Sequence, residues 1–181
     1  MKPVKVGLLG LGTVGTGVVR IIEGHREDLI GQVGSPIEIG RVAVRTLDKP
    51  RAVAIESSRL TDDPWEVVRD PGIDVVVEVM GGVEPTKAYI LEALKLGKHV
   101  VTANKDLMAL CGSEILSTAR EHGCDVMYEA SVAGGIPIIR TLIEGFSSDR
   151  IDRIIGIVNG TTNYILTKMT QEGASYEEVL R

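Results

Sequence analysis

Short apolar runs alternate along the chain with segments of helical period. Five runs rich in valine and isoleucine are typical of strands: Val4–Leu9, Ile37–Val44, Asp74–Val79, His99–Thr102 and Asp125–Tyr128. Between them, apolar residues recur three or four positions apart, as they do along the buried face of a helix. Strands that alternate with helices predict βαβ units joined in one sheet. The pattern therefore predicts an α/β fold with a Rossmann-type, doubly wound, mostly parallel sheet.

The predicted helices lie in the segments between these strands. Val14, Val18 and Ile22 mark the apolar face of a helix after the first strand, and Ile115 and Ala119 mark another. Two more helices are predicted over Pro64–Arg69 and Pro85–Leu96, the second opened by its proline and closed by Gly97. Residues 75–77 are all valine, which indicates a central strand covered by helices on both faces.

The strand rhythm changes near residue 130, where we place a domain boundary. Residues 1–130 are expected to form a dinucleotide-binding domain, and residues 131–181 the beginning of an α+β substrate and dimerisation domain. This second part should contain a short helix ending near Glu144, a strand over Ile151–Val158 and an amphipathic helix with Leu166 on its apolar face.

A helix start is predicted close to the end of the sequence. Ser175 followed by Glu178 matches a capping box, in which each residue satisfies a backbone N–H of the other. A helix of about six residues does not sustain itself in water, because nucleation is unfavourable. We therefore expect the 181 residues to be part of a longer protein, with an incomplete second domain.

Composition and charge exclude several classes of protein. With 44% hydrophobic and 25% charged residues, the chain has the composition of a folded globular domain. The net charge of −5, without a basic cluster, argues against a nucleic-acid partner. No apolar run approaches the roughly 18 residues that span a bilayer, so we expect no membrane partner and a cytoplasmic location. Cys111 and Cys124 are too few for a disulfide scaffold, and we expect both to be reduced and buried.

A glycine-rich turn follows the first strand and opens the first helix. The pattern of three glycines in this context is the fingerprint of dinucleotide binding, because the helix amino terminus offers free N–H groups to a pyrophosphate. The alternative is a tight strand-to-helix turn without a ligand. We take the turn as a cofactor site whose residues are Gly10, Leu11, Gly12, Thr13, Val14 and Gly15.

The residues after the second strand bear on the choice of cofactor. An acidic residue there usually binds the ribose 2′-hydroxyl of NAD, whereas an arginine accommodates the 2′-phosphate of NADP. Here Arg45 follows the strand, with Lys49 and Arg51 nearby and Asp48 as the one acidic competitor. The three cations favour NADP(H), with NAD(H) still possible. The alternative is that they are solvated loop charges.

Three further segments are expected at the carboxyl ends of strands, where open α/β sheets bind ligands. They are Thr102–Lys105, Glu129–Pro137 and Asn159–Asn163. Together with the glycine turn they resemble homoserine dehydrogenases, and the resemblance covers essentially the whole chain. That family interconverts L-homoserine and L-aspartate 4-semialdehyde with NAD(P), on the route to threonine, methionine and isoleucine.

The resemblance also implies roles for individual residues. Lys105 would lie near the nicotinamide and the substrate, where an ammonium group can polarise a carbonyl or stabilise a developing alkoxide. Thr102 and Gly160 would contact the nicotinamide end of the cofactor. In the family, a monovalent cation, usually sodium, is held mainly by backbone carbonyls, which correspond here to Glu129, Val132, Gly134 and Ile136.

The family further implies a homodimer, paired through the second domain's sheet, to which Ile151–Val158 should contribute. It also carries acidic substrate-binding residues and a second lysine beyond the position of Arg181. We therefore expect this polypeptide alone to bind NADPH but to turn over homoserine negligibly.

Two other hypotheses about the function stay open. One is a different Rossmann dehydrogenase, such as a sugar dehydrogenase, although these typically show Glu-Lys-Pro where Ala103-Asn104-Lys105 stands here. The other is a non-catalytic NADP-binding sensor. The segment Met80-Gly81-Gly82 either borders the nicotinamide or is merely a flexible loop.

Overall fold

The computed structural model describes residues 2–156 and 159–180, which fall into two compact units. The first unit spans residues 1–139 and the second spans residues 140–181. Each unit is described by itself below. The boundary near residue 130 that the sequence suggests for the cofactor domain stays a prediction.

The first unit is built on a six-stranded sheet in which every pairing is parallel. The strand order is β3-β2-β1-β4-β5-β6, so the order reverses between β1 and β4. This is the Rossmann order, and such a reversal is where these sheets bind ligands. The strands are β1 Val4–Leu9, β2 Ile37–Ala43, β3 Leu60–Thr61, β4 Val75–Glu78, β5 His99–Thr102 and β6 Val126–Met127.

The five predicted strands are therefore confirmed, with small differences at their ends. Strand β3 was not predicted, because two residues are too few to show a period. It pairs with the end of β2, where Val42 lies opposite Leu60.

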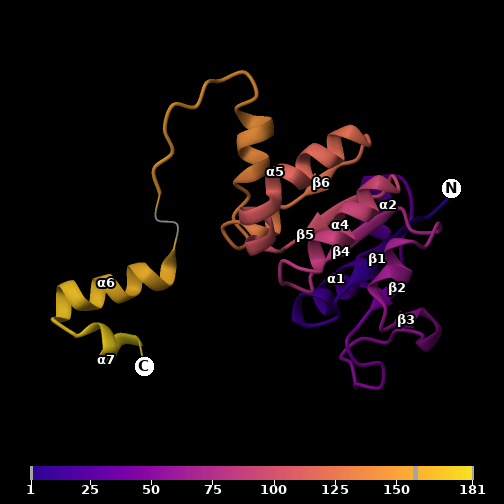
Figure 1. The fold of residues 1–181 in the computed structure, drawn as a ribbon, viewed down its shortest axis with the longest axis horizontal. Helices are drawn as coiled ribbons and strands as arrows, with labels where there is room; N and C mark the ends of the chain where they lie inside the picture. Colours follow the sequence, from indigo (N-terminus) through magenta and orange to yellow (C-terminus); the bar gives the residue numbers. More distant parts are fainter. Residues whose placement is uncertain (1, 157–158, 181) are drawn as a thin grey trace. The chain divides into compact units, whose positions relative to one another are not determined.

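Helices cover both faces of this sheet (Figure 1). They are α1 Thr13–Gly24, α2 Arg26–Val33, α3 Pro64–Val68, α4 Thr86–Lys95 and α5 Lys105–Glu121. Four of them confirm the helices expected from the apolar period. Helix α2 was missed because it has no buried residue and so shows no apolar stripe. Pro85 precedes α4 instead of opening it, whereas Gly97 follows the helix with a positive φ of 76°, as predicted.

The core consists of two apolar layers, one on each face of the sheet. On one face Leu9, Val76 and Val100 pack with residues of α3, α4 and α5, among them Leu94 and Ile115. On the other face Val6, Leu8 and Val42 pack against Val19 of α1. Because neighbouring residues of a strand point to opposite faces, Leu8 and Leu9 are both completely buried, each in a different layer. The sheet is thus held in place by packing from both sides.

The second unit contains helical segments and no strand among its described residues. A helical turn, η3, spans Thr141–Gly145, which confirms the short helix expected near Glu144. Helix α6, Gly160–Glu172, confirms a helix at the predicted place, although none of its residues is buried, and the Asn159 side chain accepts a hydrogen bond from the Thr162 N–H at its start. Helix α7, Tyr176–Leu180, follows.

The capping box at the start of α7 is confirmed atom by atom. The Ser175 N–H donates to the Glu178 carboxylate at 2.9 Å, and the Glu178 N–H donates to the Ser175 hydroxyl at 3.3 Å. The Glu178 carboxylate accepts from the Ser175 N–H and also, at 2.9 Å, from the Ser175 hydroxyl, and these two hydrogen bonds lower the pKa of Glu178.

The strand predicted over Ile151–Val158 is wrong for residues 151–156, which have no regular secondary structure. The side chains of Ile154 and Ile155 are 68% and 85% exposed. A strand needs a neighbouring strand to pair its backbone groups, and the described part of this unit provides none. Ile157 and Val158 lie outside the described residues.

The cysteines agree only partly with expectation. Both are free thiols, but Cys124 is buried and Cys111 is only half-buried, because it lies on the side of α5 between core and solvent. Burial raises the pKa of the Cys124 thiol, so this group stays protonated at neutral pH. Across the described residues, each helix is too short or too polar to span a membrane.

Candidate functional site

The turn between β1 and α1 needs glycine at its first position. Gly10 has a φ of 102°, which favours glycine, and a Cβ atom there would lie 3.0 Å from the Val79 carbonyl oxygen. The Gly10 N–H donates to the Ala43 carbonyl at 3.0 Å. The turn is therefore fixed against the ends of both β2 and β4.

The other two glycines differ from each other in a way that bears on ligand binding. A Cβ atom on Gly15 would lie 2.2 Å from the Gly10 carbonyl oxygen, so this position is glycine because helix and turn pack closely. A Cβ atom on Gly12 would have no atom within 4 Å. A tight turn without a ligand explains Gly10 and Gly15, but it gives no reason for the open space at Gly12.

The amino terminus of α1 leaves backbone donors available beside this space. Gly12 is the N-cap residue and offers no side chain to the helix, and the first turn contains no acidic residue. The N–H groups of Thr13 and Val14 have no hydrogen-bond acceptor among the described residues. Free N–H groups and the positive end of the helix dipole favour an anion. The open space and these donors fit a diphosphate.

The loop after β2 holds the predicted cations in two different ways. Arg51 donates to the carbonyls of Thr46, at 2.6 Å, and Leu47, at 3.1 Å, and also to that of Lys49. Its guanidinium thus shapes the loop. Arg45 is exposed, and its side chain makes no ion pair within the described part of the chain. Arg45 and Lys49, without Arg51, are the cations of this loop that stay available to a ligand.

Strand β4 ends in a carboxylate that the sequence analysis did not single out. Glu78 is completely buried. One carboxylate oxygen accepts from the N–H groups of Met80 and Gly81 at 2.9 and 3.0 Å, and the other accepts from the Thr102 hydroxyl at 2.7 Å. The signal that could have revealed it is a charged residue inside a run of valines predicted to be buried on both faces.

Thr102 and Asn104 continue these contacts to the start of α5. The Thr102 hydroxyl also accepts from the Asn104 N–H at 3.0 Å. The Asn104 amide donates to the Gly82 carbonyl at 2.6 Å, and its oxygen caps α5 by accepting from the Leu107 N–H. Lys105 is therefore the first residue of a firmly held helix, and its side chain is exposed at the carboxyl edge of the sheet. Thr102, in contrast, is buried within the edge.

The segment predicted to hold sodium forms a tight loop after β6. Its residues Glu129–Ser131 form the short helical turn η2, and Ala133, Gly134 and Gly135 all have positive φ values of 55°, 42° and 88°. The Glu129 carboxylate accepts from the Ile139 N–H at 2.9 Å, which closes the loop. The predicted sodium ligands are backbone carbonyls of this loop, and the sodium site stays a prediction. Gly160 begins α6 in the second unit, and its contact with the cofactor also stays a prediction.

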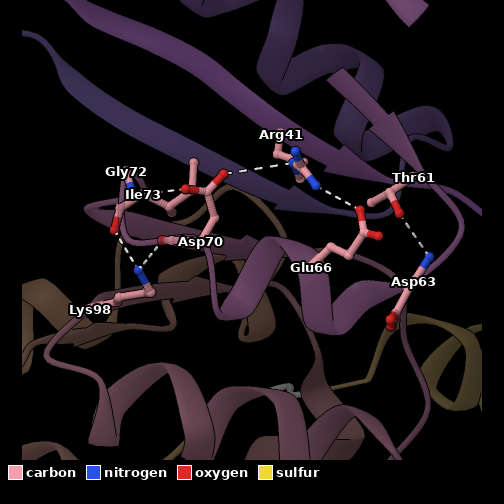
Figure 2. Close-up of polar contacts among 8 residues, drawn as sticks. All are labelled: Arg41, Thr61, Asp63, Glu66, Asp70, Gly72, Ile73 and Lys98. Carbon is pink, nitrogen blue, oxygen red and sulfur yellow. Dashed lines mark hydrogen bonds and ion pairs between the residues drawn. The ribbon is translucent and has the colours of Figure 1, made fainter. Parts of the chain in front are cut away.

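A second cluster of polar side chains lies around α3 (Figure 2). Lys98, which precedes β5, is 5% exposed and donates to the carbonyls of Asp70 and Ile73 at 2.6 and 2.8 Å. Arg41 of β2 forms ion pairs with Glu66, at 2.6 Å, and Asp70, at 3.7 Å. We call these five residues the Lys98 cluster.

A surface hollow of about 440 Å³ adjoins Lys98, and we considered it as an alternative site. The basic side chains in its lining are already engaged: Arg69 pairs with Glu92, and the Nδ1 atom of His99 accepts a hydrogen bond from the Asp125 N–H. Lys98 itself is used by the two carbonyls. The hollow thus offers no uncommitted cation, unlike the carboxyl edge of the sheet.

Comparison with protein families and solved structures agrees with this geometry. Residues 10–129 match the family model of the homoserine dehydrogenase NAD-binding domain, and residues 137–181 match that of homoserine dehydrogenase. A homoserine dehydrogenase of Thiobacillus denitrificans superposes with a TM-score of 0.90 at 49% identity, covering 99% of this chain and 42% of that one. One from S. aureus superposes with a TM-score of 0.83 at 43% identity, with the same coverage.

Relatives of known sequence lead to the same family. The chain is 60% identical to homoserine dehydrogenase of Bacillus subtilis over 181 residues, which is 100% of this chain and 42% of the relative. It is 51% identical to that of Synechocystis over 179 residues, which is 98% of this chain and 40% of the relative. The chain thus spans about two fifths of the length of these relatives, and neither match favours a sugar dehydrogenase or a nucleotide sensor. The buried parallel sheet, its glycine turn and these matches together show that the chain belongs to the homoserine dehydrogenase family.

Proposed function

We propose that this chain binds NADP(H) and serves the interconversion of L-homoserine and L-aspartate 4-semialdehyde. The observation that carries the proposal is the open space at Gly12 beside the unpaired N–H groups of Thr13 and Val14. A diphosphate in this space would accept hydrogen bonds from both donors. The family membership supports the substrate, because the matched relatives are named homoserine dehydrogenases.

The preference for NADP(H) over NAD(H) rests on Arg45. It is exposed two residues after the end of β2, where a 2′-phosphate is recognised in this fold, and no described carboxylate pairs with it. Arg51 supports the preference indirectly, since its three hydrogen bonds fold the loop that carries Arg45 and Lys49.

Lys105 is the residue we propose to act on the substrate. Its ammonium group is exposed at the same edge of the sheet, at the first position of α5. There it would donate a hydrogen bond to the substrate oxygen and stabilise negative charge on it. The bound nicotinamide supplies or accepts the hydride.

Other parts of the proposal extend from the family resemblance. A sodium ion would bind at Glu129, Val132, Gly134 and Ile136, the functional form would be a homodimer, and the reaction would belong to threonine and methionine biosynthesis in the cytoplasm. We expect neither a nucleic-acid nor a membrane partner.

The proposal is tested by titrating the purified chain with NADPH and NADH and following nucleotide fluorescence. We expect NADPH to bind more tightly, and Arg45→Asp to weaken NADPH binding by roughly a hundredfold while NADH binding is unchanged or improved. Arg120→Asp is the matched control, because Arg120 lies exposed in the last turn of α5, at the far end of that helix from Lys105. Absence of affinity for both nucleotides in a folded sample would overturn the proposal, and unchanged NADPH binding by Arg45→Asp would overturn the preference.

A further inference from the structure

Most of the buried polar side chains of the described residues belong to one network. Six polar or charged side chains are buried, and four of them are joined by hydrogen bonds, directly or through the backbone of residues 80–82: Glu78, Thr86, Thr102 and Asn104. Burying polar groups is unfavourable unless they are paired, so a concentration of them at one place needs a reason. We call these four residues the Glu78 network.

We propose that Glu78 is a positioning residue, which holds the Met80–Gly82 loop and, through Thr102 and Asn104, the start of α5 in one arrangement that receives the nicotinamide half of the cofactor. This inference rests on the proposed function, because it assumes that a dinucleotide binds at this edge. It answers the question that the sequence left open about residues 80–82.

The contacts of Glu78 show how one side chain can hold two loops. The side-chain oxygens of Glu78 accept three hydrogen bonds, two from the backbone of the loop and one from the Thr102 hydroxyl. The far side of the loop is held as well, since the Thr86 hydroxyl donates to the Gly81 carbonyl at 2.9 Å. Gly81 and Gly82 both have a φ of 77°, so the loop needs these tethers to keep its shape. Hydrogen bonds therefore hold the loop in one shape, so it is more than a flexible connection.

Asn104 joins this loop to the helix that carries Lys105. Its amide nitrogen donates to the Gly82 carbonyl, while its amide oxygen caps α5. A shift of the loop would therefore move the helix start, and with it Lys105. The exposed lysine is thus positioned by residues that are themselves buried.

The network lies entirely in one half of the fold. A Rossmann sheet binds a dinucleotide across two mononucleotide halves, and the four residues come from the half formed by β4, β5 and the following helices. Arg45 lies in the other half, after β2. Disturbing the Glu78 network should therefore weaken the contacts of the nicotinamide half more than those of the adenosine half.

The test compares two ligands on the 181-residue chain. NADPH occupies both halves, whereas adenosine 2′,5′-bisphosphate reports only the adenosine half. We expect Glu78→Gln to weaken NADPH binding by roughly tenfold and to leave adenosine 2′,5′-bisphosphate binding unchanged. The reason is that the NH₂ group of the glutamine cannot accept the hydrogen bond that the Thr102 hydroxyl donates to Glu78. Asn104→Ser is the second variant. Serine still caps α5 but cannot reach Gly82, so the same selective loss is expected.

Glu66→Gln is the matched control, since Glu66 is a half-exposed member of the Lys98 cluster. It should leave both affinities unchanged. Equal losses for the two ligands in Glu78→Gln and Asn104→Ser, or no loss for either, would overturn the inference. If Glu78→Gln does not fold, Asn104→Ser alone decides between these outcomes. A wild-type chain that binds neither ligand would overturn the proposed function first, which distinguishes the two failures.

Discussion

Two charged side chains are buried among the described residues of the first unit, and they lie at opposite edges of its sheet. Glu78 ends β4 at the carboxyl edge, and Lys98 precedes β5 at the amino edge. Both are satisfied largely by the backbone, Glu78 by two N–H groups and Lys98 by two carbonyls. The same physical solution thus appears twice, once with an acid and once with a base.

The two clusters differ in what surrounds the buried charge. The Lys98 cluster closes on itself, because the side chains around it are paired with one another at the surface (Figure 2). The Glu78 network instead leads, through Asn104, to the start of α5 and the exposed Lys105, whose side chain has no partner among the described residues. A buried charged side chain therefore does not mark a functional site by itself. A functional site is marked by exposed groups that such a side chain positions and that have no partner within the protein.

The largest effect that separates the two edges is expected from Lys98→Met. Removing the ammonium leaves the buried Ile73 carbonyl without a donor, whereas the Asp70 carbonyl still accepts from the Ile73 N–H, so the free energy of unfolding should fall by about 1–3 kcal/mol. NADPH affinity of the folded chain should stay unchanged. Urea unfolding and a fluorescence titration measure the two quantities. Lys95→Met, at an exposed position of α4, is the control and should change neither. A large loss of NADPH affinity in Lys98→Met would contradict the proposal that only the carboxyl edge of the sheet binds the cofactor.

Gly12→Ser, at the carboxyl edge, should give the opposite pattern: NADPH binding should weaken while stability is retained. The serine side chain would occupy the space left for the diphosphate, and NADPH binding should weaken by roughly tenfold or more. Serine is also a favourable N-cap residue, so stability should be unchanged or rise by a few tenths of a kcal/mol. Gly17→Ser provides the matched control, because a Cβ atom there also meets open space but lies beyond the first turn of α1. Full NADPH affinity in Gly12→Ser would contradict the cofactor site.

Arg41→Met should have a smaller effect on the Lys98 cluster. Its ion pairs involve side chains that are between 30% and 50% exposed, and such pairs contribute about 0.2–1 kcal/mol. The midpoint of urea unfolding should therefore move only slightly, and less at high salt than at low salt. A loss as large as that of Lys98→Met would show that the ion pairs, and not the buried ammonium, hold the cluster.

The smallest effect concerns pH. Burial lowers the pKa of Lys98 below its ordinary value of 10.5, although the carboxylates of Asp70 and Asp74 oppose this shift. The folded state then binds fewer protons than the unfolded state between the lowered pKa and 10.5, so Lys98 makes stability rise with pH in that window. Unfolding measured across this alkaline range should show the rise in wild type but not in Lys98→Met. Parallel curves for the two proteins would contradict the shift.

Much of the fold could be predicted because a buried strand or helix shows a local pattern of apolar residues in the sequence. Strands β1 and β5 begin and end at the predicted residues, since β1 lies between Pro3 and Gly10 and the valines of β5 lie between His99 and Thr102. The strand expected over residues 151–156 failed for the opposite reason. Its isoleucines have the right composition, but a strand forms only beside a partner. Helix α2 was missed because an exposed helix leaves no apolar period.

The candidate site divides in the same way. Sequence alone determined the α/β class, the position of the glycine turn and the cations after β2, because glycine spacing and strand ends are local features. Only the tertiary structure decided that Arg51 binds its own loop, and that Glu78 joins residues from two strands. The contact between Glu78 and Thr102 joins groups that lie 24 positions apart in the chain. Pairing at such a distance is set by the packing of the whole sheet, which no local pattern records.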